Sequence, residues 1–276
     1  MAKLALVLLV ALLFPPSAAA HLRTGTVAVD YRARIVRAPA GAVSVGVYES
    51  DRALHVSVRP GHSLVVFGYL GEPLVRIGDD GDATATSSPT AAATKLTVHG
   101  RSAVWHDVRT SSAHWRIPVQ VDGAREAVVG VTTKLPHPTL WPWLVLVAAL
   151  CVAALRVAPA PLGVASSVAA VVVAVAFVAS AYADPGTWIA GVDELFFIAA
   201  GLGVLRWGPP VARLPSVAWL GLVGLAVGLS KGQVFLHSLV LSALPGTIVR
   251  LAAAVAIGAG LAGAVAACVS YVRTES

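Results

Sequence analysis

The second half of this chain is almost entirely apolar, and this feature limits its possible folds more than any other. From Trp141 onward nearly every residue is Ala, Val, Leu or Gly, and charges occur at only a few points. The whole chain is 57% hydrophobic and 12% charged over 276 residues, which is too apolar for an ordinary soluble protein. We therefore expect residues 141–276 to form a multi-pass transmembrane domain.

A membrane-crossing helix needs about twenty predominantly apolar residues. Five candidate spans lie near residues 141–157, 162–183, 187–205, 216–230 and 247–272. Residues 232–246 are also apolar, but Ser238, Ser242 and Pro245 interrupt them. A sixth span there stays open as an alternative, and an interfacial or re-entrant segment is the preferred interpretation.

Residues 1–20 have the pattern of a secretory signal peptide. Lys3 precedes an apolar run, and the run ends in the small residues 18–20, as a cleavage site requires. Cleavage after Ala20 makes His21 the new N-terminus, while cleavage after Ala19 leaves one residue in front of it. This leader predicts that the region after it is exported.

The charged residues between the spans agree with that orientation. With an exported N-terminal region and five spans, the C-terminus is cytoplasmic. Arg206, Arg213 and Arg273 then lie on the cytoplasmic side, as the positive-inside rule predicts, and Lys231 is the one exception. We expect a multi-pass protein of the plasma membrane, with the lipid bilayer as its first partner.

The exported region, residues 21–138, shows apolar residues at period two. Leu54, Val56 and Val58 alternate with polar residues, as does the stretch 115–121, which is typical of half-buried strands. Asp122 and Gly123 separate two such runs and predict a two-residue hairpin turn. About eight or nine short strands at this spacing predict an all-β immunoglobulin-like sandwich, with residues 79–94 as a long exposed loop.

Copper is the metal that the exported region suggests. A mature N-terminal His21 offers its α-amine and its ring nitrogen, and nitrogen ligands suit copper. The nominated partner is His106, where Asp107 would orient the ring as carboxylates beside metal-binding histidines do. The alternative is that Trp105 anchors the core while His106 and Asp107 only end a strand.

A second candidate site lies within the apolar half. Asp193 and Glu194 fall inside a predicted span, where acids are costly and face a partner, a cavity or an ion path. Lys231 and His237 are assigned to the same outer side and are the natural counter-groups. This membrane polar site is either a site for a cation or proton, or an ion pair that locks helices together.

A family resemblance follows from two stretches of the exported region. Residues 103–109 (AVWHDVR) and 115–123 (WRIPVQVDG) resemble a group of uncharacterised actinobacterial membrane proteins with a secretion leader, an exported β-domain and several C-terminal spans. Val108 stands where that family has a second histidine. More distantly, the layout is similar to copper-resistance proteins of the CopC and CopD type, although Met1 is the only methionine. The resemblance implies the architecture and no activity.

The sequence shows none of the common catalytic signatures, such as HExxH, CxxC, a Walker loop or a hydrolase elbow. No basic run with interleaved aromatics suggests nucleic acid. The leading hypothesis is therefore a non-catalytic membrane protein that displays an extracytoplasmic β-sandwich and binds or handles copper. The alternatives are an envelope scaffold or sensor that binds a protein or polymer, and a component of an ion-coupled transporter.

Overall fold

The computed structural model describes residues 27–48, 53–94, 96–153, 157–180 and 185–275. The predicted signal peptide and His21 therefore lie outside the described residues. The chain divides into two compact units. One is the β-unit, Val29–Pro136, and the other is the helical unit, which runs from His137 onward and includes Ala28.

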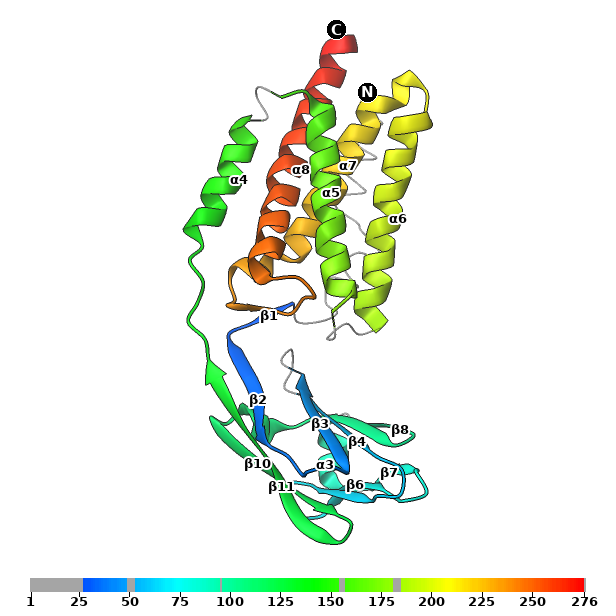
Figure 1. The fold of residues 1–276 in the computed structure, drawn as a ribbon. Coiled ribbons are helices and arrows are strands. Elements are labelled where there is room, and N and C mark those ends of the chain that lie inside the picture. Colours follow the sequence, from blue (N-terminus) through cyan, green and yellow to red (C-terminus); the bar gives the residue numbers. More distant parts are fainter. Residues whose placement is uncertain (1–26, 49–52, 95, 154–156, 181–184, 276) are drawn as a thin grey trace. The chain divides into compact units, whose positions relative to one another are not determined.

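The β-unit is built from antiparallel strands in two sheets (Figure 1). Within the described residues one sheet has six strands in the order β2-β11-β10-β5-β6-β7, and the other has four in the order β3-β4-β9-β8. The strands of the first are β2 (Tyr31–Arg37), β5 (Leu64–Phe67), β6 (Pro73–Ile77), β7 (Ala83–Ala85), β10 (His114–Val121) and β11 (Ala124–Lys134). Those of the second are β3 (Val43–Tyr48), β4 (Ala53–Val58), β8 (Thr97–His99) and β9 (Ser102–His106).

Both sheets contribute to one hydrophobic core. Leu54, Val56 and Val58 of β4 are buried together with Ile117 and Val119 of β10. The polar residues between them point away from this core, so the period-two alternation of the sequence is confirmed. Burial of each such aliphatic side chain contributes about 1.5–3 kcal/mol, and this core has no disulfide, because both cysteines lie in the helical unit.

The hairpin turn predicted at residues 122–123 is also confirmed. Val121 pairs with Ala124 across the end of β10 and β11, which leaves a two-residue loop. Asp122 has φ +50° and Gly123 has φ +83°, as a type I′ turn requires. Asp tolerates this left-handed region better than most residues, and Gly occupies it freely.

The prediction of an exposed loop over residues 79–94 was wrong. The structure places β7 there, followed by the short helix α3 (Pro89–Ala93). Ser88 caps α3 by accepting a hydrogen bond from the Ala91 N–H, and proline is favoured at the first helical position. Thr90 of α3 is only 2% exposed, and its buried hydroxyl is satisfied by donating a hydrogen bond to the Glu72 carboxylate.

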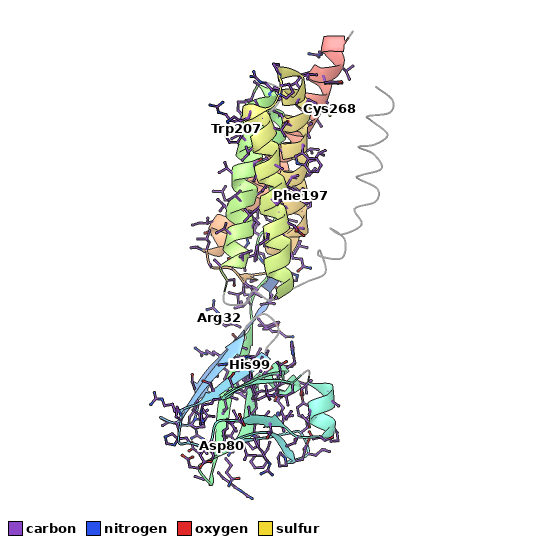
Figure 2. The ribbon with its side chains drawn as sticks, turned by 90° about the vertical axis from the view of Figure 1, so that its right-hand side faces the viewer. Arg32, Asp80, His99, Phe197, Trp207 and Cys268 are labelled. Atoms are coloured by element: carbon purple, nitrogen blue, oxygen red, sulfur yellow. The ribbon has the colours of Figure 1, made fainter. Side chains whose placement is uncertain are left out.

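In its described residues the helical unit contains five α-helices (Figure 1). They are α4 (Trp141–Ala153), α5 (Pro159–Val178), α6 (Pro185–Trp207), α7 (Arg213–Ser230) and α8 (Gly246–Glu275). Figure 2 shows Phe197 and Trp207 along α6 and Cys268 on α8.

Three helices in the described part of the chain are long and apolar enough to cross a membrane, where the sequence predicted five spans. They cover Pro159–Val178, Pro210–Ser230 and Gly246–Arg273. The described apolar stretch of α4 is shorter, Trp141–Val152.

Small residues let α5, α7 and α8 pack closely. A Cβ atom at Gly260 of α8 would lie 2.6 Å from the carbonyl oxygen of Gly221 in α7, and the reverse distance is the same. The Ser166 hydroxyl of α5 donates a hydrogen bond of 2.9 Å to the Ala256 carbonyl of α8. Small residues at such positions let membrane helices approach closely.

The segment between α7 and α8 forms no α-helix and so no sixth helical span. It contains a 3-10 turn, η3 (Gly232–Phe235), and β12 (Leu239–Val240). β12 pairs with β1 (Ala28–Val29), and the Leu241 N–H donates to the Val27 carbonyl at 2.9 Å.

Candidate functional site

The Trp105-His106-Asp107 cluster lies at the end of β9, where side chains alternate between the core and the surface. Trp105 is 1% exposed and Asp107 is 3% exposed, while His106 between them points to the surface. β9 ends at His106, and Asp107 caps the 3-10 turn η1 (Val108–Ser111) that follows. This arrangement is the alternative that the sequence left open, in which Trp105 anchors the core.

The Asp107 carboxylate is fully used inside the β-unit. Its Oδ2 accepts hydrogen bonds from Trp105 Nε1 at 2.9 Å and from Arg109 Nη2 at 2.7 Å. Its Oδ1 accepts from Arg109 Nε at 2.9 Å and from the Arg109 backbone N–H at 3.0 Å. This two-point guanidinium–carboxylate pair is the geometry that arginine favours. The prediction that Asp107 orients the His106 ring was therefore wrong, because both oxygens face the buried side.

Arg109 connects this pair to the other sheet. It donates to the carbonyl group of Phe67 (3.1 Å), the last residue of β5, and to that of Gly68 (3.4 Å), the next residue. Its guanidinium carbon lies 5.1 Å from the centre of the Tyr69 ring, close enough for a cation–π contact. The Tyr69 hydroxyl in turn accepts a hydrogen bond from the Val108 N–H. The cluster is thus a structural clamp between the two sheets.

The predicted copper site stays a prediction. His106 is exposed on β9, and His21 lies outside the described residues. No group of three or more His, Cys, Asp or Glu side chains in the described part of the chain is placed to hold a metal ion.

A second arginine clamp and a histidine–carboxylate pair lie near the β10–β11 hairpin. Arg101 donates to the carbonyl groups of Val58, Arg59 and His62, among others. Nδ1 of His62 lies 2.7 Å from Oδ2 of Asp122. Hydrogen bonds from the Ser63 N–H and from His62 lower the pKa of the Asp122 carboxyl below its ordinary value. The pair is exposed, and it fixes the hairpin to the start of β5.

The structure brings two of the four residues of the predicted membrane polar site together. Nζ of Lys231, at the end of α7, lies 3.8 Å from Oε1 of Glu194 in α6. The Lys231 ammonium also lies 5.6 Å from the centre of the Phe177 ring of α5. Three helices therefore meet at this pair, in which both side chains are mostly buried.

The other two residues of the predicted site are Asp193 and His237. Asp193 is on the exposed side of α6, because neighbouring helical residues point about 100° apart. His237 follows η3, and its backbone carbonyl accepts a hydrogen bond of 2.8 Å from Arg250. Glu194 and Lys231 are therefore the two members of the predicted site that the structure pairs, and the polar site as a whole stays a prediction.

Arg250 is an arginine clamp that the sequence analysis did not identify. It lies in the second turn of α8 and donates to the carbonyls of Val234 (2.7 Å), His237 (2.8 Å) and Ser238 (2.9 Å). These bonds satisfy backbone groups that the 3-10 turn leaves without helical partners. A basic residue early in a span is the only sequence signal for this clamp.

No protein-family model, no curated protein and no solved structure matches this chain. The function must therefore be argued from the geometry of the two units.

Proposed function

We propose that this protein displays a non-catalytic binding domain outside the plasma membrane, as an envelope scaffold or sensor. One observation carries the proposal: the β-unit and the helical unit each have a hydrophobic core of their own. The helical unit supplies helices that suit a bilayer, and the β-unit supplies a domain that is apolar inside and polar outside. An immunoglobulin-like sandwich is the form we propose for that domain.

The anchor in this proposal crosses the membrane five times, with α4 and α6 as the additional spans. Both helices pack on the other three. A Cβ at Gly258 of α8 would lie 2.8 Å from Cβ of Leu150 in α4, and the rings of Phe197 in α6 and Trp219 in α7 have centres 5.9 Å apart. Five crossings put the predicted exported domain outside and Arg273 in the cytoplasm, which agrees with the positive-inside rule.

Neither rival function gains support from the site geometry. The Asp107 carboxylate cannot orient the His106 ring, because Arg109 and Trp105 already occupy it. The Glu194–Lys231 pair links three helices, which favours a structural ion pair over an ion path. The copper prediction depends on the mature N-terminus, so N-terminal sequencing followed by copper titration is its direct test.

Cysteine labelling in intact cells tests the proposed topology. In a background with Cys151→Ala and Cys268→Ala, a His106→Cys variant marks the β-unit and an Arg273→Cys variant marks the end of α8. We expect a membrane-impermeant maleimide to label position 106 in intact cells. Position 273 should react only after permeabilisation. Labelling with the opposite pattern, or at both positions in intact cells, contradicts the proposal.

A crosslinking experiment tests the binding role. A photo-reactive residue at exposed positions of the β-unit should capture a defined envelope partner in living cells. The same residue at the exposed Val265 of α8 is the control. A pattern of products identical for both positions, or no product from the β-unit, counts against a scaffold or sensor.

A further inference from the structure

The outward face of the six-stranded sheet carries an array of cationic side chains, which we name the arginine face. Its members are Arg34, Arg37, Arg76, Arg116, Arg125 and His114, and all six are exposed. They come from four strands, β2, β6, β10 and β11. The array therefore forms only in the assembled sheet and cannot be recognised from the sequence.

Strand register places these residues on one face, because directly paired residues in antiparallel strands point to the same side. Arg34 pairs with Val131, which pairs with His114. Arg37 pairs with Val129, which pairs with Arg116.

These two sets of paired residues form two rows across the sheet. A third row extends over four strands. Arg125 pairs with Gln120, Gln120 pairs with Val65, and Val65 pairs with Arg76. Along β10 the three rows fall at positions 114, 116 and 120, which share one face at period two.

No acidic residue occupies an outward position in the described strands of this sheet. Glu126 lies on the opposite face of the sheet, since it pairs with the core residue Val119. The nearby acids lie in turns, such as Asp80 between β6 and β7 (Figure 2) and Asp122 in the hairpin. Among the described residues, the five arginines of the face form no ion pair. Within the described part of the β-unit, no ion pair offsets the mutual repulsion of these five arginines.

We propose that the arginine face binds a linear anionic polymer of the cell envelope, a glycan or polyol chain that carries phosphate or carboxylate groups. This inference rests on the proposed function, because the β-unit must be outside the cell to meet such a polymer. Charge complementarity supports the assignment, since guanidinium groups pair with both anions through two parallel hydrogen bonds.

The shape of the sheet favours a flexible chain over a flat lipid surface. Neighbouring strands rotate by roughly 20–25°, and β2 and β6 are four steps apart in the sheet. The arginines at the two ends therefore point in directions that differ by about 80°. A planar bilayer engages only part of such a twisted face, whereas a linear polymer follows the twist and contacts every row.

The test uses the purified full-length chain in nanodiscs of a zwitterionic lipid. The probes are fluorescent polygalacturonate, which carries carboxylates, and inorganic polyphosphate, and binding is measured by fluorescence anisotropy. The variant R34Q/R116Q removes two cations from the face. The matched control R59Q/K134Q removes two exposed cations that lie outside it, since Arg59 follows β4 and Lys134 is out of phase with Thr133 on β11.

We expect the face variant to weaken binding of at least one probe by about tenfold or more, because each lost cation reduces attraction to an anionic surface. The control should change the Kd by less than about twofold. The variant R34K/R116K, which keeps the charges, should bind more tightly than R34Q/R116Q. Raising the ionic strength to about 0.5 M should weaken wild-type binding, because salt screens exposed charges.

Three results overturn the inference. They are the absence of polymer binding at low salt, equal losses in the face and control variants, and tighter binding to vesicles of an anionic lipid than to either polymer. Each variant is first checked for an unchanged thermal midpoint. Because the cysteine labelling above tests exposure of the β-unit in cells, a failure here with correct labelling rejects only the polymer, and not the proposed display function.

Discussion

Three arginines in this protein, Arg101, Arg109 and Arg250, bind backbone carbonyl groups and thereby fix segments that have no regular secondary structure. Each guanidinium has five N–H donors in a planar fork, so one side chain can satisfy several carbonyls of a turn. Arg109 also binds the Asp107 carboxylate at 2.7 Å. At the residue scale, Arg101 and Arg109 hold loops of the β-unit in place without disulfides, and Arg250 holds the segment before α8.

The first prediction concerns Asp107. An Asp107→Ala variant leaves Arg109 and the Trp105 N–H without their buried acceptor. Removing one partner of a buried pair costs about 3–5 kcal/mol, so we expect a loss of unfolding free energy near the lower end, since Arg109 is partly exposed. The neighbouring His106→Ala change should stay within about 0.5 kcal/mol. Urea unfolding of the full chain followed by circular dichroism measures both, and equal losses contradict the clamp.

The second prediction concerns Gly130 in β11. A Cβ there would overlap the indole ring of Trp115, its cross-strand partner. We expect Gly130→Ala to lower the unfolding free energy by about 1–3 kcal/mol through overpacking. Gly46 in β3 is the matched control, because a Cβ at that position meets nothing within 4 Å. A Gly46→Ala variant as unstable as Gly130→Ala would contradict overpacking against Trp115 as the cause of the loss.

The third prediction concerns pH. The folded state lowers the pKa of Asp122, mainly through the Ser63 N–H and the His62 ring. Its contribution to stability is therefore present above the unfolded pKa of about 3.9 and is lost as the pH falls through the lower folded value. We expect Asp122→Asn to flatten the acid side of the stability profile. Thermal midpoints from pH about 7 to about 3 test this, with Glu126→Gln on the same hairpin as the control.

At the element scale, α8 organises the helical unit, since its glycines approach α7 and its Arg250 holds the segment that precedes it. The contact between Gly221 and Gly260 is between backbones, which cannot yield as a flexible side chain can. Close approach of this kind is what small residues make possible in membrane helices.

The fourth prediction follows from that contact. We expect Gly221→Ala to push α7 and α8 apart and to lower the thermal midpoint of the helical signal. Gly203→Ala in α6 is the control, because its Cβ would meet only the Trp207 ring at an ordinary 3.9 Å. Circular dichroism of the full chain in detergent compares the two variants, and an unchanged midpoint for Gly221→Ala would refute the close α7–α8 contact.

The fifth prediction concerns Arg250. An Arg250→Gln variant loses the donors to three carbonyls of residues 234–238. We expect faster amide hydrogen exchange in this segment, with little change at the centre of α8. The control is Arg213→Gln at the start of α7. Unchanged exchange in residues 232–241 would contradict the clamp.

Local patterns predicted the elements of this fold better than the contacts between them. The alternation at Leu54, Val56 and Val58 and the turn at Asp122-Gly123 are local signals, and both were confirmed. The loop prediction for residues 79–94 was wrong because the short strand β7 depends on pairing with β6. Ser88 and Pro89 did offer a helix-start signal that the composition of the segment obscured.

The candidate sites were less predictable than the strands. Asp107 and Glu194 were recognised as notable, but their partners Arg109 and Phe177 were not. Carbonyl groups are present at every residue, so an arginine that binds them leaves no pattern in the sequence. Partners of this kind emerge only from tertiary packing.

At the scale of the whole molecule, the order of strands in the six-stranded sheet governs how the β-unit can form. β2 near the start pairs with β11 at the end, so the sheet closes only when both are present. In a chain threaded across a membrane from its N-terminus, the β-unit cannot complete its fold until Lys134 has emerged. Trp141, the first residue of α4, follows almost at once. If the β-unit is exported as we propose, its translocation and the arrival of α4 at the membrane are nearly simultaneous. The unfinished sheet, with its long-range pairing, must then be kept from aggregation until that moment.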